Sequence, residues 1–102
     1  MNVLMARATV KATAVTDIEE AGRRVFEALE REQAQGFRYM TCRLPDGVTY
    51  LNVWELEDGV DNPLSNMPEA RAFQEGLKTW VAEPPTYEQL TVVGSYRFFS
   101  KG

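Results

Sequence analysis

The order in which strand-like and helix-like periodicities follow one another constrains this chain most. Two segments carry apolar residues at helical spacing, and each lies between segments that alternate as strands do. The predicted helices are residues 16–35 and 66–82. The predicted strands are residues 3–12, 37–44 and 48–56, with a fourth strand contained within residues 87–99. This β-α-β-β-α-β order predicts an α+β, ferredoxin-like domain with a four-stranded antiparallel sheet. Because βαβ crossovers are right-handed, both helices are expected on one face of the sheet.

Both predicted helices begin at a capping pattern. Thr16 and Glu19 have the spacing of a capping box, and Gly36 stands where a left-handed residue ends a helix. Asn66 and Glu69 resemble a second capping arrangement. The two patterns predict helix starts near Thr16 and Asn66.

Composition and charge exclude several classes of protein. The 102 residues, 1–102, make one domain of ordinary size. The net charge is −4 and the arginines are scattered, so there is no basic stripe for a nucleic acid. No apolar run approaches the roughly 20 residues of a membrane helix or has the form of a secretion signal. The single cysteine, Cys42, suits a reducing cytoplasm.

Histidine is absent from the sequence. Its absence excludes the commonest metal ligand, the usual general base and every triad that contains histidine. The acidic residues at positions 55–61 lack calcium-loop spacing, so we interpret them as a solvated loop and predict no metal site.

Residues 50–54 concentrate hydrogen-bonding aromatic residues on one strand face. Because successive strand residues point to opposite faces, Tyr50, Asn52 and Trp54 share a face and Leu51 and Val53 share the other. We expect Leu51 and Val53 to pack beneath the helices. The aromatic face is then the one that no helix covers, where it lines a cavity or joins two subunits.

This uncovered face predicts a homodimer. It would carry Met5, Tyr39, Tyr50 and Trp54 with aromatic residues of the last strand, more apolar surface than a monomer usually exposes. Burying such side chains is worth about 1.5–3 kcal/mol each. A second copy of the chain, sheet against sheet with two-fold symmetry, is the simplest cover.

Four segments carry a resemblance to a known family: residues 53–58 (VWELED), 68–73 (PEARAF), 82–85 (AEPP) and 90–96 (LTVVGSY). Together with the element order, they resemble the antibiotic-biosynthesis-monooxygenase-like family of the dimeric α/β-barrel superfamily. The resemblance covers nearly the whole chain. It implies a homodimeric barrel whose cavity binds a small phenolic or polycyclic molecule.

One branch of the family is not matched. Haem-degrading relatives use an asparagine on the first strand, a tryptophan before the second helix and an iron-ligating histidine on that helix. The corresponding positions of this chain hold Arg7, Pro63 and Phe73. Haem degradation is therefore not expected.

The quinone-forming monooxygenases of the family resemble this chain better. They need no cofactor and hold a phenol with asparagine, tryptophan and tyrosine side chains. The resemblance implies catalytic roles for Asn52, Trp54 and Tyr50, with Asn52 donating to a phenolate and Trp54 stacking on its ring. The alternatives are that Trp54 anchors the dimer interface and that Asn52 only completes a polar network.

Basic and polar residues on neighbouring strands are further candidates. Arg7, Tyr39 and Arg43 fall at alternating positions and, pointing inward, would suit an anionic or phenolic ligand. Pairing with acids of a second subunit, or solvation, is the alternative reading. Cys42 alternates with the residues expected beneath the helices, so it is predicted to be a buried structural thiol.

The leading hypothesis is a cytoplasmic homodimer that binds a small aromatic molecule, with cofactor-independent oxygenation as its enzymatic form. Two alternatives stay open. One is a non-catalytic ligand-binding or interaction module on the same scaffold, and the other is an enzyme that cyclises or isomerises a polyketide-like substrate.

Overall fold

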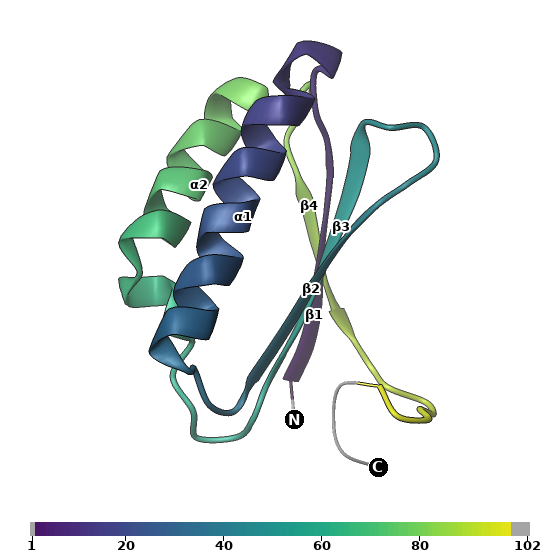
Figure 1. Ribbon diagram of the computed structural model, residues 1–102. Coiled ribbons are helices and arrows are strands. Elements are labelled where there is room, and N and C mark those ends of the chain that lie inside the picture. The colour runs from purple at the N-terminus through teal and green to yellow at the C-terminus, as the bar shows by residue number, and fades with distance from the viewer. Residues whose placement is uncertain (1, 99–102) are drawn as a thin grey trace.

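A computed structural model describes residues 2–98 (Figure 1). The main elements, in chain order, are β1 (Asn2–Thr9), α1 (Val15–Glu32), β2 (Phe37–Arg43), β3 (Thr49–Leu56), α2 (Pro68–Trp80) and β4 (Thr86–Leu90). Two short 3₁₀ helices, η1 (Ala12–Ala14) and η2 (Pro63–Asn66), precede α1 and α2. The predicted element order is confirmed.

The four strands form one antiparallel sheet in the order β2-β3-β1-β4. Both helices lie on the same side of it, as Figure 1 shows. The predicted α+β, ferredoxin-like fold is therefore confirmed. The last strand lies at the start of the range predicted to contain it, because pairing with β1 ends at Leu90. Residue 99, the end of that range, lies outside the described residues.

The predicted capping boxes do not form. The α1 helix follows directly from η1 and starts at Val15, so no side chain caps its first turn. Its left-handed C-cap is Gln33, at φ 51°. Gly36, at φ 71°, lies in the approach to β2, where a Cβ atom would stand 2.8 Å from the Val60 side chain. Glu19 is left free of the backbone, and its carboxylate reaches the sheet instead.

The second capping arrangement is also replaced. The Asn62 side chain accepts from the Leu64 backbone N–H and caps η2, while α2 begins after Met67 without a side-chain cap. Glu69 pairs with Arg31 of α1 at 3.2 Å. The two helices are thereby linked at their outer surface.

Two apolar clusters hold the helix layer on the sheet. One joins Val10, Ile18, Tyr50 and Leu77, with Phe73 packed against it. The other consists of Val25, Ala28, Met67 and Ala70, with Tyr39 of β2 packed against it. The helices approach each other closely, whereas side chains rather than backbone bridge the distance to the sheet. The layers can therefore enclose space between the clusters.

The faces of the sheet are the reverse of the prediction. Tyr50 is only 5% exposed and packs beneath the helices, and the Tyr39 ring stacks on Phe26 of α1 with centroids 5.0 Å apart. Leu51 and Val53 lie on the uncovered face, half-buried. The alternation of side chains along a strand determines which residues share a face, but it does not determine which face packs against the helices. On the inward face, Tyr50 packs with Ile18 and Leu77 of the helices, and Tyr39 packs on Phe26, so these large side chains bridge the two layers.

The reversal also corrects the prediction for Cys42. This residue shares the uncovered face and is exposed, so its thiol is not a buried structural group.

Candidate functional site

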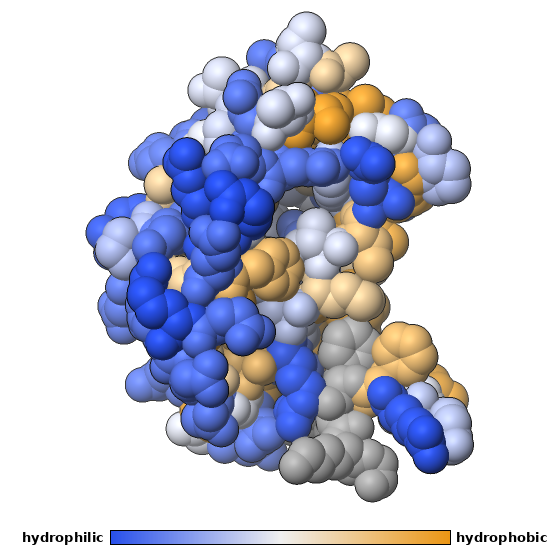
Figure 2. All heavy atoms as spheres, viewed as in Figure 1, coloured by the Kyte–Doolittle hydropathy of each residue, from blue (hydrophilic) through white to orange (hydrophobic). Residues whose placement is uncertain are grey.

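A cavity of about 840 Å³ lies between the helices and the inner face of the sheet. Both helices and all four strands contribute to its wall. Figure 2 shows the molecule hollowed between the helix layer and the β2–β3 hairpin. The volume is in the range of ligand sites in proteins, and most of the wall is apolar.

Five of the six predicted site residues line this cavity: Tyr39, Arg43, Tyr50, Asn52 and Trp54. The structure thus gathers them in one place, although within a single subunit rather than on the uncovered face. Their catalytic and binding roles stay predictions.

Arg7 is the exception. It is exposed and points away from the cavity, because its neighbours Ala6 and Ala8 occupy the inward positions of β1. The prediction that Arg7 lines the same cavity as Tyr39 and Arg43 is therefore wrong.

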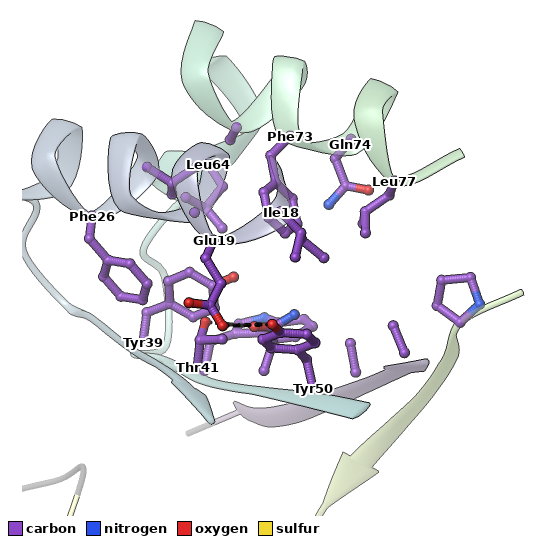
Figure 3. A pocket seen from close by; sticks show the side chains of 18 of the residues that line it. Ile18, Glu19, Phe26, Tyr39, Thr41, Tyr50, Leu64, Phe73, Gln74 and Leu77 are labelled. Carbon is purple, nitrogen blue, oxygen red and sulfur yellow. Dashed lines mark hydrogen bonds between the residues drawn. The ribbon is translucent and has the colours of Figure 1, made fainter. Parts of the chain in front are cut away.

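The polar centre of the cavity is the carboxylate of Glu19. One oxygen, Oε2, accepts from the Tyr50 hydroxyl at 2.6 Å and from Arg43 Nη1 at 2.8 Å. Figure 3 shows Glu19 reaching down from α1 to Tyr50 on the sheet. Burial, reinforced by the bond to Glu19, raises the pKa of Tyr50. The hydrogen bond with Tyr50, aided by the charge of Glu19, raises the pKa of Arg43.

This arrangement allows a proton to pass from a ligand to Glu19 by way of Tyr50. The neutral Tyr50 hydroxyl donates to Glu19, so its oxygen can accept a hydrogen bond from a ligand hydroxyl. Glu19 can then take up a proton that passes through Tyr50. The sequence reading missed Glu19 because it assigned the residue to a helix cap. The spacing of Glu19, Gly22 and Phe26 on one face of α1 could have revealed it.

Asn52 is oriented by its neighbour on β2. The Thr41 hydroxyl donates to Asn52 Oδ1 at 2.6 Å, so the Asn52 NH₂ group is left to donate elsewhere. The two residues are opposite each other in the β2–β3 ladder. Asn52 is thus a fixed hydrogen-bond donor on the cavity floor.

Aromatic rings form one wall. Tyr39 stacks on Phe26 and meets Trp54 edge to face, with centroids 6.4 Å apart. Burial raises the pKa of Tyr39, against a smaller effect of hydrogen bonding with Thr41. Such a wall suits a flat aromatic ligand, since ring pairs favour offset and edge-to-face contacts.

Metal-binding side chains are not gathered in the described part of the chain. Within residues 2–98, no three histidine, cysteine, aspartate or glutamate side chains are grouped so that they could hold an ion. No helix in the same range is both long and apolar enough to cross a bilayer.

The fold and its ligand-sized interior define the class of ferredoxin-like α+β domains with a cavity between the layers. No protein-family model matches the chain, and no curated protein matches its sequence. Solved structures do match. A protein of Nitrosomonas europaea, proposed to be an antibiotic biosynthesis monooxygenase, aligns with a TM-score of 0.76 at 20% identity, covering 92% of this chain and 100% of that one.

Two further structures are similar. SnoaB, a cofactor-independent oxygenase from Streptomyces nogalater, aligns with a TM-score of 0.69 at 16% identity, covering 94% of this chain and 96% of its own. A proposed antibiotic biosynthesis monooxygenase from Caulobacter crescentus gives a TM-score of 0.72 at 14% identity, over 91% and 90% of the two chains. The chain thus has the fold of antibiotic biosynthesis monooxygenases, as the resemblance predicted.

Proposed function

We propose that this protein is a cytoplasmic homodimer that binds a phenolic or polycyclic aromatic molecule in the interlayer cavity and oxygenates it without a cofactor. One observation carries the proposal: Tyr50, Asn52 and Trp54 line a ligand-sized cavity with aromatic walls. Their side chains are of the types that would hold a phenol. The shared fold with SnoaB, a cofactor-independent oxygenase, supports the choice of reaction.

The geometry suggests how the chain's own residues act. The ligand ring lies against Tyr39 and Trp54, and its hydroxyl donates to the Tyr50 oxygen. The proton moves through Tyr50 to Glu19, and the Asn52 NH₂ group stabilises the phenolate. The electron-rich ring carbon then reacts with O₂. One oxygen atom replaces the C–H bond as a quinone carbonyl, and the other leaves as water with the C–H and O–H protons.

Oxygen uptake tests this proposal. The purified protein is supplied with a set of naphthols and anthrones while O₂ consumption and quinone absorbance are recorded. We expect uptake and quinone formation with at least one compound. Asn52→Ala should reduce the rate by about 10²-fold or more, the usual effect of losing one oxyanion donor. Asn66→Ala, which removes an exposed carboxamide outside the cavity, should not.

Other results would separate the alternatives. No uptake with any compound contradicts oxygenation. A ligand that binds and is recovered unchanged indicates a binding module, whereas a rearranged product without O₂ consumption indicates a cyclase or isomerase.

The homodimer is proposed from the face that no helix covers. Met5, Met40, Leu51 and Val53 lie there, each half-buried. The exposed hydrophobic residues of the segment after β4 add apolar surface: Val92, Val93, Tyr96 and Phe98. A second copy packed on this face would bury these sheet residues and the hydrophobic residues after β4. Sedimentation equilibrium at micromolar concentration should give a dimer, and a stable monomer would contradict the proposal.

A further inference from the structure

The charge of the cavity differs in sign from the charge of the chain. The chain has 15 acidic and 11 basic residues, for a net charge of −4. The charged side chains that line the cavity are those of Arg23, Arg43, Arg71 and Glu19. The cavity therefore carries a positive excess in an acidic protein, which favours an anionic ligand.

Two of these arginines already have partners. Arg43 is paired with Glu19 at 2.8 Å, and Arg23 is paired with Glu20 and Glu27 on its own helix. Arg71, by contrast, has no carboxylate partner within residues 2–98. Its guanidinium is the cavity charge that is left for a ligand.

The position of Arg71 has no evident benefit for the fold. It lies in the first turn of α2, where the positive end of the helix dipole makes a cation unfavourable. The same dipole adds to the attraction of an anion at this end of the cavity. A bound anion would offset the unfavourable interaction between the Arg71 charge and the helix dipole.

Neutral hydrogen-bond donors surround this end of the cavity. Asn62 Oδ1 accepts from the Leu64 N–H at 2.9 Å, which leaves the Asn62 NH₂ group free to donate. Ser65 of η2 and Gln74, one turn beyond Arg71, also line the cavity, and Gln74 hangs from α2 over the sheet in Figure 3. The sole lining carboxylate in the described chain, Glu19, is already engaged by Tyr50 and Arg43.

We propose that Arg71 anchors a carboxylate of the ligand, so that the substrate class is aromatic carboxylates that also carry a phenolic hydroxyl. This inference rests on the aromatic-binding cavity of the proposed function and specifies its ligand. A guanidinium and a carboxylate form two parallel hydrogen bonds, which fix orientation as well as charge. The phenolic hydroxyl is then free to reach Tyr50.

A pair of probes that differ only in charge tests the inference. Binding of 6-hydroxy-2-naphthoate and of its methyl ester to the wild-type protein is measured by calorimetry. We expect the acid to bind about tenfold more tightly, which corresponds to about 1.4 kcal/mol. Because Arg71 is exposed, added salt should weaken binding of the acid and leave the ester unchanged.

Two variants identify the residue responsible. In Arg71→Gln the preference for the acid should disappear while ester binding is kept. Arg24→Gln makes the same charge change at an exposed position of α1 outside the cavity, and should keep the preference. Circular dichroism confirms that both variants are folded.

Three outcomes would overturn the inference: equal binding of acid and ester by the wild type, an equal loss for both probes in Arg71→Gln, or no binding of either probe at millimolar concentration. None of them decides the oxygenation proposal, because uptake with uncharged naphthols and anthrones is measured separately. Conversely, a charge preference without oxygen uptake would support the ligand class and reject the reaction.

Discussion

The Tyr50 hydroxyl donates to Glu19 Oε2 across 2.6 Å, and this bond links the middle of the sheet to the first helix through the cavity. It joins a buried tyrosine to a carboxylate that is half-exposed. The bond should therefore contribute to the stability of the fold whether or not the protein catalyses a reaction.

Tyr50→Phe should lower the free energy of unfolding by about 1 kcal/mol, because the ring stays packed while one hydrogen bond is lost. This value lies below the roughly 1.5–3 kcal/mol of a bond to a charged group, because Glu19 keeps Arg43 as a partner and is half-exposed. Urea denaturation followed by fluorescence gives the value. Tyr87→Phe, at an exposed tyrosine of β4, is the matched control and should be neutral. Equal effects of the two variants would show that the bond contributes nothing.

Thr41→Val should weaken phenol binding by up to about tenfold, because the Asn52 carboxamide loses the donor that fixes its orientation. Thr41→Ser keeps the hydroxyl and should restore binding. Calorimetry with 2-naphthol measures both. If valine and serine behave alike, the orientation of Asn52 is set by something other than Thr41.

Stability should fall as the pH rises above about 10. Burial raises the pKa of both Tyr39 and Tyr50 above the ordinary value of 10.0. Between that value and the folded-state pKa, the unfolded chain has lost these protons and the native chain has not, so unfolding becomes more favourable as pH increases. Urea midpoints at pH 9, 10 and 11 measure the slope. The double variant Tyr39→Phe, Tyr50→Phe should show a smaller slope, and an unchanged slope would be inconsistent with late titration of these two groups.

Val53→Glu should convert the proposed dimer to a monomer, because it places a charge beside Met5, Met40 and Leu51 on the uncovered face. Thr79→Glu introduces the same charge on an exposed position of α2 and should leave the dimer intact. Sedimentation velocity distinguishes the two states. A dimer that persists in Val53→Glu would place the interface elsewhere.

The sequence was sufficient for the order of the elements and for the set of residues that share each strand face. Tyr50, Asn52 and Trp54 do stand together, because strand alternation is a local property of the backbone. It was insufficient for the direction in which that face turns. The direction depends on which side chains the helices present to the sheet, and those that pack with Tyr50, such as Ile18 and Leu77, are far away in the sequence.

Glu19 shows a second limit. A hydroxyl followed by an acid three residues later is a capping pattern, yet η1 runs directly into α1 and removes the need for a cap. The carboxylate then finds stronger partners in Tyr50 and Arg43, which are adjacent only in the folded chain. Arg71 could not be distinguished from a surface charge either, because the residues that share the cavity with it come together only in the folded chain.

Proton–nitrogen spectra of the two tryptophan indoles test the central claim most directly. Trp54 lines the cavity, whereas Trp80 lies outside its wall in the apolar cluster around Leu77. During titration with 2-naphthol, the Trp54 signal, assigned with a Trp54→Phe variant, should shift and saturate while the Trp80 signal changes little. A Trp54 signal that does not move while 2-naphthol binds would contradict the account, because the ligand would then occupy another site.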